Sequence, residues 1–238
     1  MVEVGAVTRA VLAILADGSD ERSLAEGVCA ACVGGLDIDG AGLSVLTATA
    51  SRETLWATDE VAELLEDLQF TLNEGPCMEA ATTGSPVFVA DLHHSSQTGR
   101  WPIFDAALAE QAEVGALFAL PLQWGTVNLG VLDLYRVTPG ALVAAARRDV
   151  LAAVEAAAVM MLSQRTEPED PAGGIHGWLG RDLGGRTEIH QATGMVLDQL
   201  RASPIDALAR MRAYAFAERR LLIDVARDVI ARRLRFTP

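Results

Sequence analysis

Hydrophobic residues near the start of the chain recur at the spacing of an amphipathic helix. The first such stripe consists of Val4, Val7, Val11 and Ile14. Asp17-Gly18 ends this helix, and Ser19 is predicted to cap a second one that ends near Gly34-Gly35. The core-facing stripe of the second helix consists of Leu24, Val28 and Cys32. We therefore expect two helices before the first strand.

The pattern then changes to the alternation and β-branched content of strands. Residues 41–50 and 54–58 predict a hairpin around the turn-like Ser51-Arg52-Glu53. A helical period follows over 61–72, and then a short helical piece that ends at Thr83-Gly84. Later elements are a strand at 87–90, a helix after Trp101-Pro102, and a hairpin of strands 114–122 and 127–135.

A long helix and a separate helical tail complete the pattern. Thr138-Pro139 supplies a predicted N-cap and first-turn proline for the long helix. Its apolar stripe is Leu142, Ala146, Val150, Val154, Ala157 and Met161. Prolines, acids and glycines over 165–174 cannot continue a helix, so residues 165–178 are expected to form a linker. Three helical segments follow at 186–201, 204–220 and 221–235, the second capped by Ser203 before Pro204.

The net charge of the chain changes sign close to the expected linker at 165–178. Residues 1–179 hold 25 acids and 8 arginines, a net charge of −17, whereas residues 180–238 hold 7 acids and 11 arginines, a net charge of +4. The basic residues are all arginines, whose planar guanidinium groups suit contacts with phosphate and with bases. The total of −13 alone would disfavour a nucleic-acid partner, but the tail has the opposite sign.

Composition favours a folded cytoplasmic protein. Hydrophobic residues make up 50% of the chain, which is sufficient for a packed core. The N-terminal segment lacks the basic start and long apolar run of a signal peptide, and no stretch has the length of a membrane helix. The three cysteines are expected to be reduced thiols. Cys29 and Cys32 have the spacing of half a metal site, but lack further ligands and are interpreted as buried hydrophobes; no metal or cofactor is expected.

The order of elements predicts an α+β fold with a mostly antiparallel sheet flanked by helices, followed by a small all-α domain of three helices. The runs NEGPCMEAATTGSPVFVADL (73–92) and GALFALPLQWGTVNLGVLDLY (115–135) resemble GAF domains. The resemblance implies a GAF-like sensor domain over residues 1–164. It also implies a pocket for a small-molecule ligand near Cys77, Glu79 and Asp91, although Glu79 and Asp91 could instead cap and solvate helix and strand ends.

The tail RTEIHQATGMVLDQLRASPIDALARMRAYAFAERRLLIDVARDVI (186–230) resembles the ANTAR domain of transcription antitermination regulators. The match rests on Ile189, Ala192 and Gly194, with further agreement at Ala207, Ala215, Leu222, Val225 and Ala226. The family usually has Lys and Asn where this chain has Thr193 and Arg219. The resemblance implies that residues 179–238 form an RNA-binding domain for stem-loops in nascent transcripts, in an arrangement of the actinobacterial type.

Candidate RNA-contacting residues lie in the first two helices of this tail. Helical spacing after Pro204 places an aromatic side chain among arginines on one face. Together with the family positions of the first helix, the candidate residues are Ala192, Thr193, Gly194, Arg212, Phe216, Arg219 and Arg220. The competing interpretation is a solvated helix edge on which Phe216 packs against a neighbouring helix.

Three function classes follow. The first is a non-enzymatic homodimeric regulator, in which the GAF-like domain senses a signal, the helix at 139–163 dimerises or relays the signal, and the tail binds RNA. The second is a DNA-binding regulator. The third helix, however, begins with Leu221-Leu222-Ile223, and these apolar side chains lack the hydrogen-bonding groups that recognise base edges in a DNA groove. The third is a GAF-type thiol enzyme such as a free methionine sulfoxide reductase, for which only Cys77 lies near the expected pocket. Catalytic motifs for phosphate, nucleophile-elbow or metal chemistry are absent from the sequence.

Overall fold

The chain consists of two compact units, Met1–Pro168 and Glu169–Pro238. The computed structural model describes residues 4–15, 20–46, 52–94, 99–166 and 186–237. Most of the predicted linker at 165–178 lies outside these residues, so its conformation stays a prediction. Among the described helices, none is both long and apolar enough to cross a bilayer.

The N-terminal unit is an α+β domain with a five-stranded sheet of order β2-β1-β5-β4-β3, in which all neighbours pair antiparallel. Its strands are β1 (Gly40–Leu46), β2 (Arg52–Ala57), β3 (Val87–Val89), β4 (Ala116–Trp124) and β5 (Val127–Arg136). Its helices are α1 (Ala6–Leu15), α2 (Glu21–Gly35), α3 (Glu60–Leu72), α4 (Pro76–Thr83), α5 (Pro102–Ala109) and α6 (Ala144–Thr166). Both predicted hairpins are present, as β1-β2 and β4-β5.

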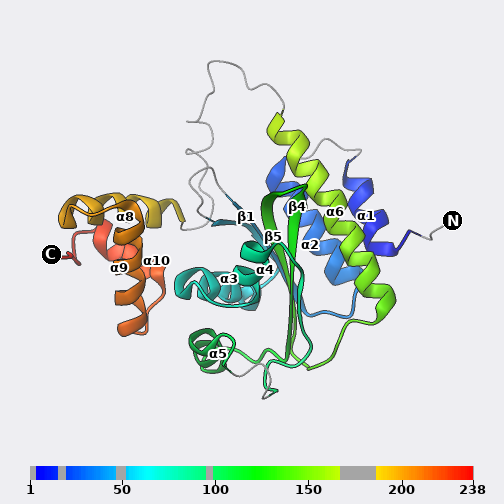
Figure 1. Ribbon diagram of the computed structural model, residues 1–238, viewed down its shortest axis with the longest axis horizontal. Helices are drawn as coiled ribbons and strands as arrows, with labels where there is room; N and C mark the ends of the chain where they lie inside the picture. The colour runs from blue at the N-terminus through cyan, green and yellow to red at the C-terminus, as the bar shows by residue number, and fades with distance from the viewer. Residues whose placement is uncertain (1–3, 16–19, 47–51, 95–98, 167–185, 238) are drawn as a thin grey trace. The chain divides into compact units, whose positions relative to one another are not determined.

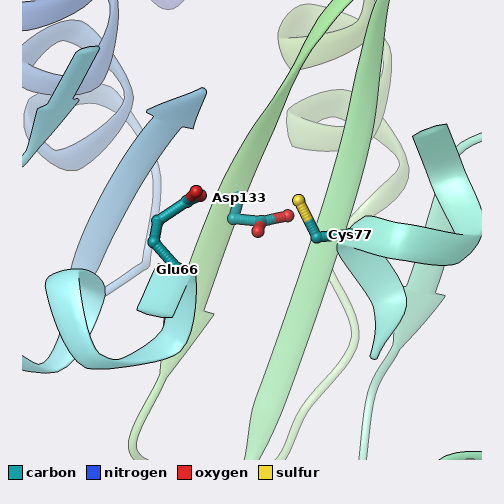
Figure 2. Close-up of side chains that lie close together, drawn as sticks. All are labelled: Glu66, Cys77 and Asp133. Carbon is teal, nitrogen blue, oxygen red and sulfur yellow. The ribbon is translucent and has the colours of Figure 1, made fainter. Parts of the chain in front are cut away.

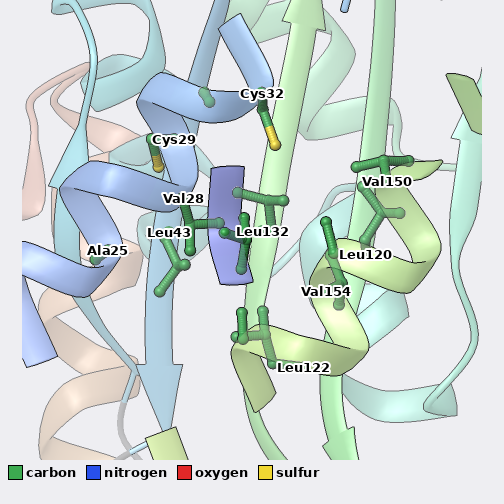
Figure 3. Packing of buried hydrophobic residues seen from close by; sticks show 14 of the residues in the cluster. Ala25, Val28, Cys29, Cys32, Leu43, Leu120, Leu122, Leu132, Val150 and Val154 are labelled. Atoms are coloured by element: carbon green, nitrogen blue, oxygen red, sulfur yellow. The ribbon is translucent and has the colours of Figure 1, made fainter. Parts of the chain in front are cut away.

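Helices cover both faces of the sheet. Figure 1 shows α1, α2 and α6 on one side and α3, α4 and α5 on the other. Strand residues alternate between the two cores: Leu132 and Leu134 of β5 belong to the core under α1, α2 and α6, whereas Val131 and Tyr135 face α3 and α4. The predicted stripe of α2 packs into the first core, where Val28 and Cys32 lie near Leu132 (Figure 3).

Two predicted helix starts are wrong. The cap of α2 is Asp20 and not Ser19, because the Asp20 carboxylate accepts a hydrogen bond from the backbone N–H of Ser23. The long helix α6 begins at Ala144 and not after Thr138-Pro139. The segment before α6 is held against the sheet instead, since the N–H of Gly140 donates to the carbonyl oxygen of Ala90 at 2.7 Å.

Helix α1 is capped by a residue distant in sequence. The carboxylate of Asp149 on α6 accepts hydrogen bonds from the backbone N–H groups of Val7 and Thr8, each at 3.0 Å. These N–H groups belong to the first turn of α1, which has no intrahelical partners for them. Asp149 therefore fixes α1 against α6.

The C-terminal unit contains three described helices, α8 (Arg186–Leu200), α9 (Pro204–Ala217) and α10 (Leu222–Ile230). Ser203 caps α9 as predicted, because its hydroxyl oxygen accepts from the N–H of Asp206. Small and aliphatic side chains fill the core: Ile189, Ala192, Val196, Ala207, Met211, Ala215, Leu222, Val225, Ala226 and Val229. The alanines allow the three short helices to pack closely around this core.

Candidate functional sites

A cluster of polar side chains is buried between the sheet and helices α3 and α4. Alternation along β1 and β5 directs Ser44 and Asp133 to the face that these helices cover. The other members are Arg52 at the start of β2, Glu66 and Gln69 on α3, and Cys77 in the first turn of α4. Figure 2 shows Glu66, Cys77 and Asp133 converging from α3, α4 and β5. Five elements thus contribute to one buried site.

Arg52 is the cation of this buried cluster. Its guanidinium donates hydrogen bonds to the hydroxyl oxygen of Ser44 and to the sulfur of Cys77. One guanidinium nitrogen lies 3.8 Å from the carboxylate of Glu66, whose side chain is 2% exposed. A buried charge is costly unless it is paired, so Arg52 and Glu66 stabilise each other in this position.

Gln69 connects the two helices to the sheet. Its amide nitrogen donates to Asp133 Oδ2 at 2.9 Å, and its amide oxygen accepts from the backbone N–H of Cys77 at 2.7 Å. Gly75, directly before α4, has a φ of 119° and approaches Gln69 so closely that a Cβ atom would lie 2.7 Å from its side chain. This glycine therefore permits the turn that places Cys77 in the cluster.

Burial shifts the proton equilibria of this cluster. The pKa of Asp133 rises to about 8, because the carboxyl group is buried and because the Glu66 carboxylate lies nearby. The pKa of the Cys77 thiol also rises well above its usual range, chiefly through burial, although Arg52 opposes the shift. Cys77 is therefore a thiol and not a thiolate near neutral pH, which is unfavourable for a nucleophile.

The cluster still has polar capacity that the protein does not use. Within the described residues, Arg52 Nε and Asp133 Oδ1 are buried without a hydrogen-bond partner. The ligand atoms of Glu66, Cys77 and Asp133 lie within 4.8 Å of one another, close enough in principle to surround a metal ion. Arg52 already supplies positive charge there, so these residues fit a small polar molecule better than a second cation.

The structure separates the three predicted ligand-binding residues. Cys77 is fully buried in the cluster. Glu79 forms an ion pair with Arg100 at the surface, and Asp91 accepts from the backbone N–H of His93 at 2.9 Å. The alternative role of Glu79 and Asp91 as surface and capping residues therefore describes their geometry.

Sequence analysis missed the charged members of the cluster. Ser51-Arg52-Glu53 was predicted as a turn, but β2 begins at Arg52 and its side chain points inward. Asp133 had a signal, because it is the one acid within the otherwise apolar strand run 127–135. No other charged residue of the core lies on the same helical stripe as Glu66, so the helical pattern does not indicate that Glu66 meets Arg52. Tertiary packing brings the two side chains together.

The remaining cysteines are structural. Cys29 and Cys32 are both free and fully buried among apolar side chains, as their interpretation as small hydrophobes predicts. Burial raises the pKa of Cys32 to about 12. Neither thiol belongs to a group of metal ligands in the described part of the chain.

The predicted RNA-contacting positions of α8 differ in exposure. Ala192 is fully buried in the core of the C-terminal unit. Thr193 is half-buried and donates through its hydroxyl group to the carbonyl oxygen of Ile189 at 2.7 Å. Gly194 is exposed, and a Cβ atom added there would meet nothing within 4 Å. Packing within the described chain therefore does not require a glycine in this helix.

The candidate residues after Pro204 also separate. The predicted helix over 204–220 ends at Ala217, so Arg219 and Arg220 lie beyond it and helical spacing does not place them on one face with Arg212 and Phe216. Phe216 is 55% exposed, and does not pack into the core of its unit. Arg219 is exposed with a φ of 50°, whereas Arg212 is half-buried. Arg220 lies half-buried in the turn before α10 and binds the Asp228 carboxylate at 2.6 Å. Arg220 thus binds a carboxylate of its own unit, and Phe216 and Arg219 are both exposed.

Comparisons with known families agree with this division. The GAF domain family matches residues 18–163, and the ANTAR domain family matches residues 179–230. Among curated proteins, a sequence search gives no match.

Several solved structures share the fold of the N-terminal unit. The GAF domain of a phosphoenolpyruvate-protein phosphotransferase from Coxiella burnetii has a TM-score of 0.54 at 12% identity, covering 67% of this chain and 92% of that one. The corresponding domain from Acinetobacter has a TM-score of 0.53 at 11% identity, covering 69% and 96%. The fRMsr of Staphylococcus aureus in its reduced form has a TM-score of 0.50 at 15% identity, covering 65% and 92%. At these identities the likeness concerns the fold alone. The chain belongs to the GAF domain family and continues into an ANTAR domain, the architecture of a GAF-ANTAR regulator.

Proposed function

We propose that this protein is a cytoplasmic, signal-responsive regulator that binds RNA stem-loops in nascent transcripts and so controls transcription termination. The observation that carries the proposal is the order of a GAF domain and an ANTAR domain in one chain. The charge difference supports it, since residues 180–238 have a net charge of +4 and residues 1–179 a net charge of −17. The architecture is that of a regulator and not of an enzyme.

The exposed side of α9 supports an RNA-binding role. Phe216 is an exposed aromatic on α9, one helical turn after Arg212, and the exposed Arg219 follows in the turn beyond the end of this helix. RNA loops present unstacked bases that stack on aromatic rings and guanidinium planes, and phosphates that attract arginine. Gly194 would allow the RNA backbone to approach α8 closely. Because Arg220 is paired with Asp228, we assign it a supporting role.

The buried cluster around Arg52 is the proposed site of signal input. A small ligand with both a hydrogen-bond acceptor and a donor would satisfy Arg52 Nε and Asp133 Oδ1. Cys77 lies in this site, whereas Glu79 and Asp91 are proposed only as surface residues near it. Since α3 and α4 both contribute to the cluster, a ligand there would shift these helices relative to the sheet.

Dimerisation would couple the two domains. Helix α6 is 23 residues long and is the last described helix of the N-terminal unit before the output domain in the sequence. A residue stripe on its solvent side includes Ala152, Glu155 and Val159, of which Val159 is 45% exposed. Pairing two copies through this helix would place two ANTAR domains on two RNA loops and raise the overall affinity through effective concentration.

The alternative functions have weaker support. A thiol enzyme needs an accessible nucleophile, but Cys77 is fully buried and its pKa is raised. A DNA reader needs polar side chains at the start of a recognition helix. The start of α10 offers Leu222, which is buried in the core.

The variants Arg212→Ala and Arg219→Ala test the proposed RNA face. We expect each to weaken binding of the full chain to a two-hairpin RNA, and Arg9→Ala on α1 to serve as a control for the change in net charge. Equal affinities for all of these proteins would exclude α9 as the RNA-contacting helix.

A further inference from the structure

The C-terminal tail is docked onto two helices of its unit, beyond the end of the ANTAR match at residue 230. The ring of Phe236 packs edge-on against the ring of Tyr214 on α9, with 5.5 Å between the ring centroids. The N–H of Phe236 donates to the side-chain oxygen of Gln199 on α8 at 2.8 Å. Figure 1 shows the C-terminus beside the end of α8. The tail therefore has a defined place on the surface.

Charge pairing holds the beginning of this tail. Arg233 binds Asp228 of α10 through two guanidinium nitrogens, each at 2.6 Å. The backbone N–H groups of Arg233 and Leu234 both donate to the carbonyl oxygen of Asp228. Together with Phe236, these contacts tie the tail to all three described helices of the unit.

Three arginines that are near in sequence to Phe236 or to the residues that it contacts have no such partner. Arg235 directly precedes Phe236, Arg210 lies one helical turn before Tyr214, and Arg201 follows Gln199 by two residues. All three are exposed, and within the described residues none forms an ion pair or hydrogen bond through its guanidinium. By contrast, the guanidinium groups of Arg220, Arg227 and Arg233 are all engaged with carboxylates.

Arg201 adopts a backbone conformation that is unfavourable for arginine. It has a φ of 50° just after α8, the position at which helices often end in glycine. A residue with a Cβ atom is strained in this region, because the Cβ atom comes too close to the following carbonyl oxygen. Glycine would adopt this turn with less strain than arginine. What arginine adds at this position is its positive charge.

The two flanks of α9 thus both carry arginine. At about 100° per residue, Arg210 lies about 160° around the helix from Arg212. Between them, the exposed ridge of α9 contains Ala209 and Ala213, which project little from the helix. An RNA helix or loop that lies along this ridge would meet Arg212 on one side and Arg210 on the other.

We propose that Arg201, Arg210 and Arg235, which flank in sequence the residues of the Phe236 contact, form a second RNA-phosphate-binding surface of the C-terminal unit. The proposal rests on the proposed function, because it assigns the partner of this surface as the same RNA. It adds residues outside the predicted RNA face, and one of them lies beyond the ANTAR match. Guanidinium groups without internal partners can form bidentate contacts with phosphate at no cost in broken ion pairs.

The test is a salt series with the full chain, a two-hairpin RNA and the double variant Arg210→Gln/Arg235→Gln. Each lost phosphate contact reduces the slope of log K against log salt by about 0.7 to 0.9. We therefore expect a slope smaller by about 1.4 to 1.8 than that of the wild-type chain. The matched control is Arg9→Gln/Arg22→Gln, which removes two exposed arginines of α1 and α2 in the N-terminal unit and should leave the slope within about 0.5 of the wild-type value.

Two outcomes would overturn the proposal, and they are distinguishable. If the wild-type chain binds RNA and Arg212→Ala weakens binding, but Arg210→Gln/Arg235→Gln has the wild-type slope, the second surface is wrong and the proposed function stands. If the wild-type chain does not bind the RNA at all, both the proposed function and this surface are wrong.

Discussion

The guanidinium of Arg220 binds the carboxylate of Asp228 at 2.6 Å, and it also donates to the carbonyl oxygen of Asp224 at 3.3 Å. This pair ties the turn after α9 to α10. The same Asp228 carboxylate binds Arg233 of the tail, so one carboxylate binds two arginines. Arg220 and Arg233 therefore hold the C-terminal unit together through Asp228.

Removing Asp228 should therefore destabilise the C-terminal unit more than removing Arg220 alone. We expect Asp228→Asn to lower the denaturant midpoint of the full chain's C-terminal transition below that of Arg220→Gln, because Asn neutralises the partner of both arginines. Chemical denaturation, monitored by fluorescence or circular dichroism, measures these denaturant midpoints. Equal midpoints for wild type and Asp228→Asn would contradict the structural role.

The pH dependence of Asp228 has a definite sign. Hydrogen bonds from Arg220 and Arg233 lower the pKa of Asp228, so its contribution to stability is present above the usual Asp pKa and is lost as pH falls through the lowered value. The stability difference between wild type and Asp228→Asn should therefore shrink on acidification below about pH 4.

Asp133 is expected to show the opposite sign. Its pKa is about 8 in the folded protein and about 3.9 in an unfolded chain, so the folded state holds a proton that the unfolded state releases between these values. Stability from this group is therefore fully present below about pH 4 and is lost as pH rises through 8. Asp133→Asn, a neutral isostere, should remove much of this slope.

Denaturation of the N-terminal unit at pH 5.5 and pH 8.5 measures the effect of Asp133→Asn. Asp149→Asn is the matched control, because hydrogen bonds to α1 lower the pKa of Asp149 and its contribution has the sign of Asp228. Identical pH dependence of wild type and Asp133→Asn would mean that Asp133 is ionised in the folded protein.

The thiols should be unreactive in the native protein. Cys29, Cys32 and Cys77 are all fully buried and free, and burial raises the pKa of each. An aromatic disulfide reagent should therefore label the cysteines only as fast as the N-terminal unit opens, and should label three per chain in denaturant. Rapid labelling of the native protein that Cys77→Ser abolishes would contradict this prediction and support the thiol-enzyme alternative.

Gly194→Ala should separate stability from RNA binding. Gly194 lies within α8 with open space around its Cα, so alanine should stabilise the helix by about 0.5–1 kcal/mol. If RNA approaches α8 at this position, the added methyl group should nevertheless weaken RNA binding. A variant that is more stable and binds RNA as tightly as wild type would remove Gly194 from the RNA-contacting surface.

Local sequence pattern predicted most of the fold. The apolar stripe of α2, the hairpin of β4 and β5, and the cap at Ser203 are all short-range features, and each is present. The start of α6 was wrong because Thr138-Pro139 is a good local cap signal, whereas the contact from Gly140 to Ala90 that overrides it is distant in sequence. The GAF and ANTAR family matches also assign a domain family to each of the two units.

The candidate sites were less predictable for the same physical reason. Cys77 was chosen from its neighbourhood in the sequence, but its partners Arg52, Glu66 and Asp133 come from elements 11 to 56 residues away. Helical spacing placed Arg220 on the predicted RNA face, and it could not reveal that Asp228 binds it. Periodicity identifies which residues face the core or the solvent, but not which charges meet there.

The most direct test of the account is the affinity of the full wild-type chain for a two-hairpin RNA and for a duplex DNA of equal charge, measured over the same salt series. The account predicts tighter binding to the RNA at every salt concentration, with a difference that persists at high salt because base stacking and loop shape contribute beyond charge. Equal and equally salt-sensitive binding to both nucleic acids, or tighter binding to the DNA, would contradict the central claim that this regulator recognises RNA.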